Sequence, residues 1–245
     1  MKDELLDRLV GKAKELRASL RGPIQVSKLC EQFGIGIEKD KLLAVDGRLI
    51  KRPDGSLCIL VKHDLTHDDL HPRQRFTIAH ELGHYILLEN HGMSSLTENN
   101  SEYFRVEKLC NRFAGALLVD SSMLEKTLWH DPYRICAQIA KVASVCRVSV
   151  QVVAREFICN GLQAVIGCTG VRKNKPVLDW GFYSMLGFEE TRYRGLREAT
   201  CLDNLKNWTK ETLQIDLTKM ETDSAEVLLG KNRRLAAIIQ KHQRK

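Results

Sequence analysis

The feature that most constrains this chain is the segment RQRFTIAHELGHYILLEN, residues 73–90, which contains HELGH at residues 80–84. Pro72 precedes the segment, and proline is well placed in the first turn of a helix. Apolar residues recur at helical spacing, which predicts one long helix through the whole segment. On that helix His80 and His84 lie about 40° apart around the axis and one turn apart along it, so their side chains project side by side.

Two imidazoles at this spacing supply half of a tetrahedral zinc site. Glu81 is rotated by about 100° from His80, so it is poorly placed as a third ligand, but it can reach a water on the same ion. This is the division of labour in His-Glu-x-x-His metallopeptidases, where the glutamate is the general base. The alternatives are two hydrogen-bonded histidines at the edge of the core, and a metal-stabilised scaffold without catalysis. The scaffold gives no reason for Glu81 beside His80.

A second helix offers the third ligand that a catalytic zinc usually has. It is predicted over residues 102–119, EYFRVEKLCNRFAGALLV. Glu107 lies in its middle, and we expect this carboxylate to complete the site. Asn111, four residues later, is expected to hydrogen-bond one of the ligands. Glu102 is the alternative ligand, although an acid at a helix start is already explained by the helix dipole.

Peptide hydrolysis by such a site also calls for a donor to the oxyanion. Tyr103, Arg105 and Tyr133 are the candidates, and the sequence does not rank them.

A further histidine cluster lies in HDLTHDDLH, residues 63–71, where His63, His67 and His71 recur every four residues. A second metal site is one interpretation. A polar loop near the cleft is the expected one, because the stretch joins a strand to a helix that begins with proline.

The rest of the N-terminal half predicts helices and a small sheet. A three-stranded antiparallel meander is expected over about residues 42–62, because Asp-Gly at 46–47 and Pro-Asp-Gly at 53–55 are turn signals between β-compatible runs. Two helices are expected before it, at residues 3–20 and 27–34.

The C-terminal half begins with two short helices around a turn, over residues 131–161, which resemble a helix-turn-helix. Strands and then helices are expected to follow, at residues 162–171, 175–185, 195–215 and 223–243. The fold class is therefore α+β. We expect a metallopeptidase domain at residues 1–125, a helix-turn-helix-like segment at 126–162, and a small α/β region with a sensor or regulatory role at 163–245.

Composition indicates in which compartment the protein is found and which partners it can have. The formal net charge of +7 permits an acidic partner but does not require one. The eight cysteines form no Cys-x-x-Cys pair, so we expect reduced core residues. The chain has neither an apolar run of about 18 residues that would span a membrane nor the apolar stretch of a secretory signal. We therefore expect a cytoplasmic protein without a membrane partner.

The two motifs together resemble the ImmA/IrrE-type metallopeptidases. RQRFTIAHELGHYILLE is followed by E-x-x-C-N-R-F-A-x-x-L-L, and the resemblance extends over about residues 5–160. Cys110 stands where the family has alanine, and LLVD at residues 117–120 replaces LLMP. Neither change removes a chemical group of the site.

The resemblance implies a zincin-like fold in which His80, His84 and Glu107 bind zinc and Glu81 is the base. Zinc is the expected cofactor, although sites of this composition accept other divalent ions. The family's substrate class is a helix-turn-helix transcriptional repressor, whose cleavage releases stress-response or mobile-element genes. The expected function is therefore a zinc-dependent endopeptidase with a protein substrate.

The rival function is a DNA-binding transcriptional regulator that uses the helix-turn-helix-like segment. A recognition helix needs side chains that reach base edges. In SVQVVAREFICNG, residues 149–161, only Gln151 and Arg155 are suited to this, and the remaining side chains are mostly apolar. Direct nucleic-acid binding is therefore the less favoured expectation.

Overall fold

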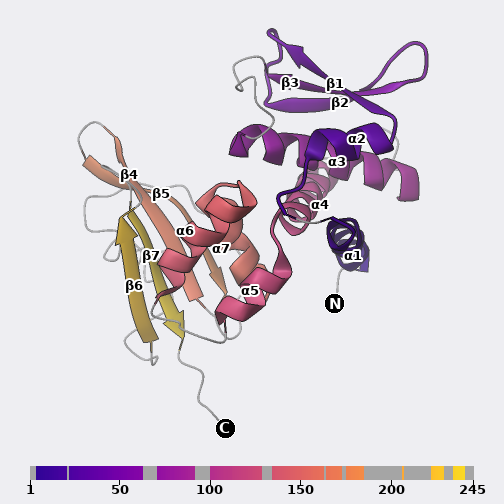
Figure 1. The fold of residues 1–245 in the computed structure, drawn as a ribbon. Coiled ribbons are helices and arrows are strands. Elements are labelled where there is room, and N and C mark those ends of the chain that lie inside the picture. Colours follow the sequence, from indigo (N-terminus) through magenta and orange to yellow (C-terminus); the bar gives the residue numbers. More distant parts are fainter. Residues whose placement is uncertain are drawn as a thin grey trace. The chain divides into compact units, whose positions relative to one another are not determined.

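The chain folds into two compact units in a computed structural model. One unit consists of Met1–Asp120 and Ser144–Ser149, and the other of Ser121–Ala143 and Val150–Lys245. Both combine helices with a sheet (Figure 1), so the expected α+β class is confirmed. The residues that the structure describes are 4–20, 22–62, 71–91, 100–128, 134–162, 164–172, 175–184, 206, 222–228 and 234–240.

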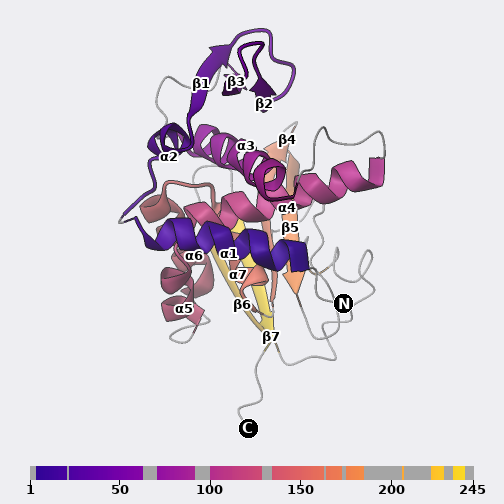
Figure 2. The same ribbon diagram turned by 90° about the vertical axis from the view of Figure 1, so that its right-hand side faces the viewer.

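The first unit contains a three-stranded sheet and helices that pack in layers. The sheet lies on one side of α3, α4 lies on the other side of α3, and α1 packs against α4 (Figures 1 and 2). The helix α3 is therefore covered on two sides, which buries residues such as Ile78, Ala79 and Leu82. The elements are α1 (Glu4–Ala18), α2 (Val26–Gln32), β1 (Ile35–Asp40), β2 (Gly47–Lys51), β3 (Leu57–Lys62), α3 (Pro72–His91) and α4 (Asn100–Leu118). The four helices agree with those predicted.

The sheet of the first unit has the strand order β1-β3-β2. The strand β2 pairs with β3 antiparallel through the predicted turn at residues 53–55, whereas β1 pairs with β3 in parallel. The expected antiparallel meander is therefore wrong in its first strand, and Asp46-Gly47 is not a hairpin turn. The reason is that the apolar run of β3, with Cys58, Ile59 and Val61 buried, takes the centre of the sheet. The chain must then cross from one edge to the other, which leaves β2 at an edge.

A buried arginine ties the start of α3 to the rest of the first unit. The Arg75 side chain is only 1% exposed, and its guanidinium donates to three backbone carbonyls. The distances are 2.7 Å from Nη1 to the oxygen of Ile24, 3.3 Å from Nη2 to that of Cys146, and 3.1 Å from Nε to that of Arg147. Two of these carbonyls lie at a helix end, where carbonyls lack partners within the helix and attract a cation.

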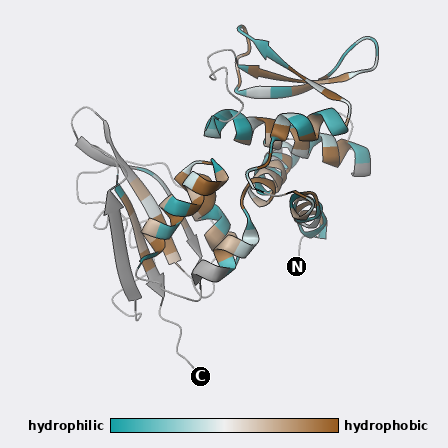
Figure 3. Ribbon diagram, viewed as in Figure 1, coloured by the Kyte–Doolittle hydropathy of each residue, from teal (hydrophilic) through white to brown (hydrophobic). Residues whose placement is uncertain are grey.

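The second unit is built on an antiparallel sheet with the order β5-β4-β7-β6. The helix α7 packs against β5, and both α6 and α7 carry hydrophobic residues among hydrophilic ones (Figure 3). The elements are α5 (Ser121–Leu128), α6 (Ile135–Cys146), α7 (Val150–Cys159), β4 (Ala164–Arg172), β5 (Lys175–Ser184), β6 (Thr222–Leu228) and β7 (Arg234–Gln240). The two predicted helices around a turn and the first two predicted strands are all present.

The helix expected over residues 223–243 is wrong, because β6 and β7 occupy this region. The sequence of β7 is RLAAIIQ, and a short apolar run of this kind does not distinguish a strand from a helix. Pairing with β4 and β6 on both sides decides the outcome and buries the run from Leu235 to Ile238. The helix expected at 195–215 lies outside the described residues, apart from Lys206.

Candidate metal centre

The close packing of α3 on α4 creates the site. A Cβ atom on Gly83 would lie 3.2 Å from the Cα of Cys110 and 3.2 Å from Cδ1 of Phe113, so the glycine lets the two helices approach. Glu107 lies one turn before Cys110 on α4. The glycine between the two histidines of the motif therefore brings a carboxylate of α4 to the imidazoles of α3.

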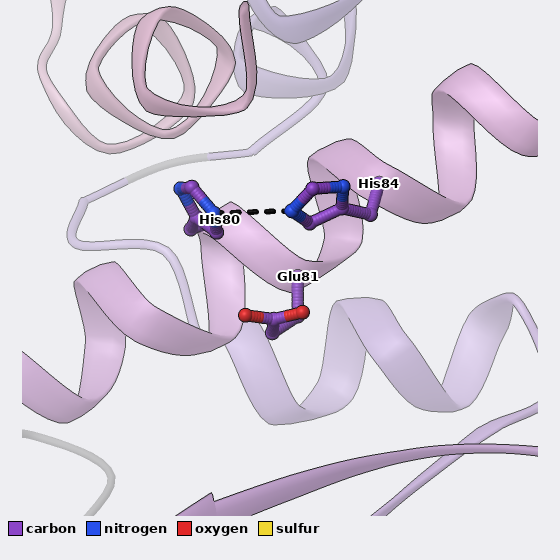
Figure 4. Close-up of side chains that lie close together, drawn as sticks. All are labelled: His80, Glu81 and His84. Atoms are coloured by element: carbon purple, nitrogen blue, oxygen red, sulfur yellow. Dashed lines mark hydrogen bonds between the residues drawn. The ribbon is translucent and has the colours of Figure 1, made fainter. Parts of the chain in front are cut away.

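Three side chains from these helices direct their donor atoms toward one another. The two Nε2 atoms of His80 and His84 are 3.2 Å apart, and their side chains are shown in Figure 4. Glu107 Oε2 lies 3.2 Å from Nε2 of His80, and its Oε1 lies 3.3 Å from Nε2 of His84. Ligands about 2.0–2.1 Å from a tetrahedral zinc ion are separated from one another by about 3.3 Å. The spacing and chemistry of the three side chains thus fit a zinc-sized divalent ion.

Asn111 fixes the orientation of the His80 ring through the nitrogen that faces away from the cluster. Its Nδ1 atom lies 3.2 Å from Oδ1 of Asn111. Because the amide oxygen only accepts, Nδ1 is the protonated nitrogen and donates to it. In the neutral ring the Nε2 lone pair is then left to face the cluster, as metal coordination requires. Asn111 lies four residues after Glu107, so one face of α4 carries both the Glu107 carboxylate and the amide that orients the His80 ring.

The electrostatics of Glu107 favour a bound cation. Burial by itself would raise the pKa of this carboxyl. When the imidazoles of His80 and His84 are protonated at Nε2, their hydrogen bonds to this carboxylate and their positive charges outweigh burial and lower the pKa from 4.5 to about 2. The carboxylate is therefore ionised at neutral pH and faces two imidazole nitrogens, which is the donor set of a zinc site with one position left for water.

Glu81 lies beside this cluster but is held differently. Its side chain is 7% exposed, and its carboxylate lies within 4.8 Å of the ligand atoms of both histidines. The backbone N–H of Leu49 on β2 donates to Oε2 over 2.9 Å. Both carboxylates therefore lie close enough to the two imidazoles to share a metal ion with them, and Glu107 contacts the imidazole nitrogens directly. The edge strand thus holds the Glu81 carboxylate next to the two imidazoles.

A cleft of about 530 Å³ opens onto the two histidines, Glu81 and Glu107. The residues of β2 line one wall, and Tyr103 on α4 lines another part of it. The negative charge of Glu107 is the main cause of the raised pKa of Tyr103, whose hydroxyl also hydrogen-bonds Glu107. Arg105 is not among the residues that line the cleft. Tyr133 lies outside the described residues.

The second histidine cluster is only partly described. His63 and His67 lie outside the described residues. The Nδ1 atom of His71 accepts a hydrogen bond from the backbone N–H of Arg73 over 3.3 Å, so this histidine caps the start of α3.

Sequence reasoning missed how β2 meets the site. The turn signal Asp46-Gly47 in fact leads directly into the edge strand that holds Glu81. The sequence signal for β2 is the short β-compatible run GRLIK, but nothing in it indicates α3 as the partner. The role of Arg75 was also missed, because its three acceptors are distant backbone carbonyls.

An α+β unit with a His-Glu-x-x-His helix beside a cleft and an edge strand has the architecture of a metallopeptidase. The sequence matches peptidase family M78, the IrrE N-terminal-like domain, over residues 30–157, which is more than half of the 245 residues. The chain belongs to this family of metallopeptidases, and the family implies a protein substrate. The resemblance to ImmA/IrrE-type proteins is thereby confirmed.

A solved structure gives a second comparison. A Mycobacterium tuberculosis transcriptional regulator matches with a TM-score of 0.51 and 14% sequence identity, covering 96% of this chain and 76% of its own. At this identity the likeness concerns the fold alone. The comparison with curated proteins gives no match.

In the part of the chain that the structure describes, no helix has both the length and the apolar character needed to cross a membrane.

Proposed function

We propose that this protein is a zinc-dependent endopeptidase whose ligands are His80, His84 and Glu107 and whose general base is Glu81. The observation that carries the proposal is the convergence of three side chains: the Nε2 atoms of His80 and His84 lie 3.2 Å apart, and each lies 3.2–3.3 Å from one carboxylate oxygen of Glu107, with a second carboxylate held beside them. A zinc ion bound there would lower the pKa of a water toward 7 and polarise the scissile carbonyl.

Glu81 then carries out both proton transfers of the reaction. Because the Leu49 N–H holds Oε2 of Glu81, we assign the proton to Oε1. This oxygen takes the proton from the attacking water and later delivers it to the leaving amine. The fixed carboxylate does not have to reorient between the two transfers, since Leu49 holds the same oxygen throughout.

Tyr103 is the residue that we assign to the oxyanion. It lines the cleft, and its hydroxyl is already a hydrogen-bonding neighbour of Glu107. The negative charge of Glu107 keeps this hydroxyl protonated, so it remains a donor. Arg105, another donor expected from the sequence, does not line the cleft.

The substrate is proposed to bind as an extended strand along β2. The strand is at the edge of its sheet, and it lines the cleft. The N–H of Leu49 points away from β3, since it donates to Glu81. In an antiparallel strand the backbone groups of alternate residues point the same way, so those of Gly47 and Lys51 also face the cleft side. A peptide added at this edge would run past Glu81.

The substrate class that we propose is a helix-turn-helix transcriptional repressor, whose cleavage relieves repression of stress-response or mobile-element genes. The resemblance of the two motifs to ImmA/IrrE-type peptidases supports this class. We assign the activity to residues 1–125, and we assign substrate docking or regulation to residues 126–162 and 163–245.

The test is to co-express the protein with a candidate repressor and to measure fragment masses together with bound zinc. Glu81→Gln should retain zinc, because Glu81 is not a proposed ligand, and should lose at least about 100-fold in cleavage rate, as expected for removal of a general base. His80→Ala should lose both zinc and cleavage. Cleavage by Glu81→Gln at the normal rate would refute the assignment of the base.

Direct DNA binding is the second candidate function, since the matched M. tuberculosis protein is described as a transcriptional regulator. The burial of α7 argues against it, because its side chains include Val152, Val153, Ala154, Phe157 and Ile158 in the buried set. Gln151 and Arg155 are partly buried as well. A gel-shift titration decides: sequence-selective, salt-sensitive binding by the purified protein would favour the regulator.

A further inference from the structure

The edge strand β2 meets α3 along one row of side chains. Arg73, Thr77 and Glu81 follow one another every four residues, so they lie along one face of α3; we name them the docking row. The strand and the residue before it contact this row at three successive points. Asp46 pairs with Arg73, Gly47 lies against Thr77, and the N–H of Leu49 donates to Glu81.

The ion pair contributes least to this contact. Asp46 accepts from Arg73 at 2.7–3.1 Å, but the two side chains are 42% and 64% exposed. Exposed ion pairs of this kind are screened by solvent and stabilise little. The approach of β2 to α3 is therefore decided at Gly47 and Leu49.

Gly47 is the tightest point of the approach. A Cβ atom at this position would lie 2.4 Å from Cγ2 of Thr77 and 3.3 Å from Cγ of Glu81. The first distance is far inside the optimum of about 3.5–4.0 Å between carbon atoms. The glycines with a positive φ among the described residues do not include Gly47, so the requirement is for space and not for an unusual backbone conformation.

We propose that Gly47 is a positioning residue for Glu81. Its missing side chain lets β2 approach α3 closely enough for the Leu49 N–H to hold the Glu81 carboxylate. While Thr77 is present, a side chain at position 47 separates the strand from the helix and breaks that hydrogen bond. The catalytic consequence rests on the proposed function, whereas the structural consequence does not.

The test uses the full chain with Gly47→Ala, and Gly11→Ala as the matched control. Gly11 lies in α1, where an added Cβ meets no atom within 4 Å. The first readout is hydrogen exchange of the Leu49 amide, measured by NMR on the zinc-free protein. Gly47→Ala should raise this exchange rate at least about tenfold, since the amide loses its acceptor, and Gly11→Ala should not change it. An unchanged rate in Gly47→Ala would overturn the proposal.

A second variant removes the atom that the new methyl group would meet. In Gly47→Ala/Thr77→Ala the Cγ2 atom is gone, and the nearest remaining atoms are Cγ and Oε1 of Glu81 at 3.3 and 3.4 Å. The double variant should regain most of the slow exchange at Leu49. The double variant also provides the test if Gly47→Ala alone does not fold. Persistent fast exchange in a folded double variant would refute the steric argument.

Zinc titration and kinetics separate this inference from the proposed function. Gly47→Ala should bind zinc as the wild type does, because no proposed ligand is among the atoms that its Cβ would meet. Against the repressor fragment that the wild type cuts, kcat should fall roughly ten- to a hundredfold, with a smaller change in KM. If the wild type cuts nothing, the proposed function fails, and amide exchange still decides the role of Gly47.

Discussion

Replacing Gly83 with alanine sets two effects of opposite sign against each other. Gly83 and Gly11 both lie inside helices, where alanine is favoured over glycine by about 1 kcal/mol. At Gly11 the added Cβ meets nothing within 4 Å, so this gain is undiminished. At Gly83 it would lie 3.2 Å from the backbone Cα of Cys110 and 3.3 Å from its Cβ. The helix α4 must therefore move away by a few tenths of an ångström.

The magnitude follows from the balance of the two effects. Overpacking a closely packed core costs about 1–3 kcal/mol. Subtracting a helix-propensity gain of about 1 kcal/mol leaves Gly83→Ala destabilised by roughly 0–2 kcal/mol, whereas Gly11→Ala is stabilised by about 1 kcal/mol. Because Glu107 lies one turn before Cys110, the carboxylate moves with α4. Zinc affinity should then fall about tenfold or more, as it does when the geometry around a ligand is disturbed.

The assay is urea unfolding of the zinc-free variants, followed by zinc titration against a competing chromogenic chelator. The difference in unfolding free energy between the two variants isolates the steric term, since both make the same substitution inside a helix. If Gly83→Ala is stabilised as much as Gly11→Ala and binds zinc as tightly as the wild type, then close approach of α4 does not set the position of Glu107.

Two further substitutions test the support of the site. Asn111→Ala should weaken zinc binding by about 10- to 100-fold, because His80 loses the group that orients its ring, and zinc titration measures this; an unchanged affinity would show that the ring is held by packing alone. Arg75→Lys should destabilise the protein by about 2 kcal/mol or more, because an ammonium group cannot reproduce the planar fork that reaches three carbonyls. Urea unfolding measures this loss, and an unchanged midpoint would mean that the three hydrogen bonds add nothing to stability.

The helices of the first unit were predictable because their information is local. The spacing of His80 and His84, the proline before α3 and the apolar periodicity all lie within a few turns of one helix. Glu107 and Asn111 could be chosen for the same reason, since their four-residue spacing places them on one face of α4. The structure brings these residues together at hydrogen-bonding distances.

The sheets were less predictable because strands depend on partners that are distant in sequence. The turn before β3 was identified from Pro-Asp-Gly, which acts locally. The parallel pairing of β1 and the strand character of β7 were not identified, because RLAAIIQ is compatible with either a helix or a strand until β4 and β6 lie on its two sides.

The sequence by itself determined which groups we propose for the chemistry: two imidazoles and a carboxylate on one helix, and a carboxylate with its amide neighbour on another. Only the tertiary structure decided how these groups are held. Positions 83 and 47 favour glycine because Cys110 and Thr77 lie so close to them in space that an added Cβ atom would crowd them. The hydrogen bond to Glu81 comes from a backbone N–H, a group that every residue except proline carries, so side-chain identity could not reveal it.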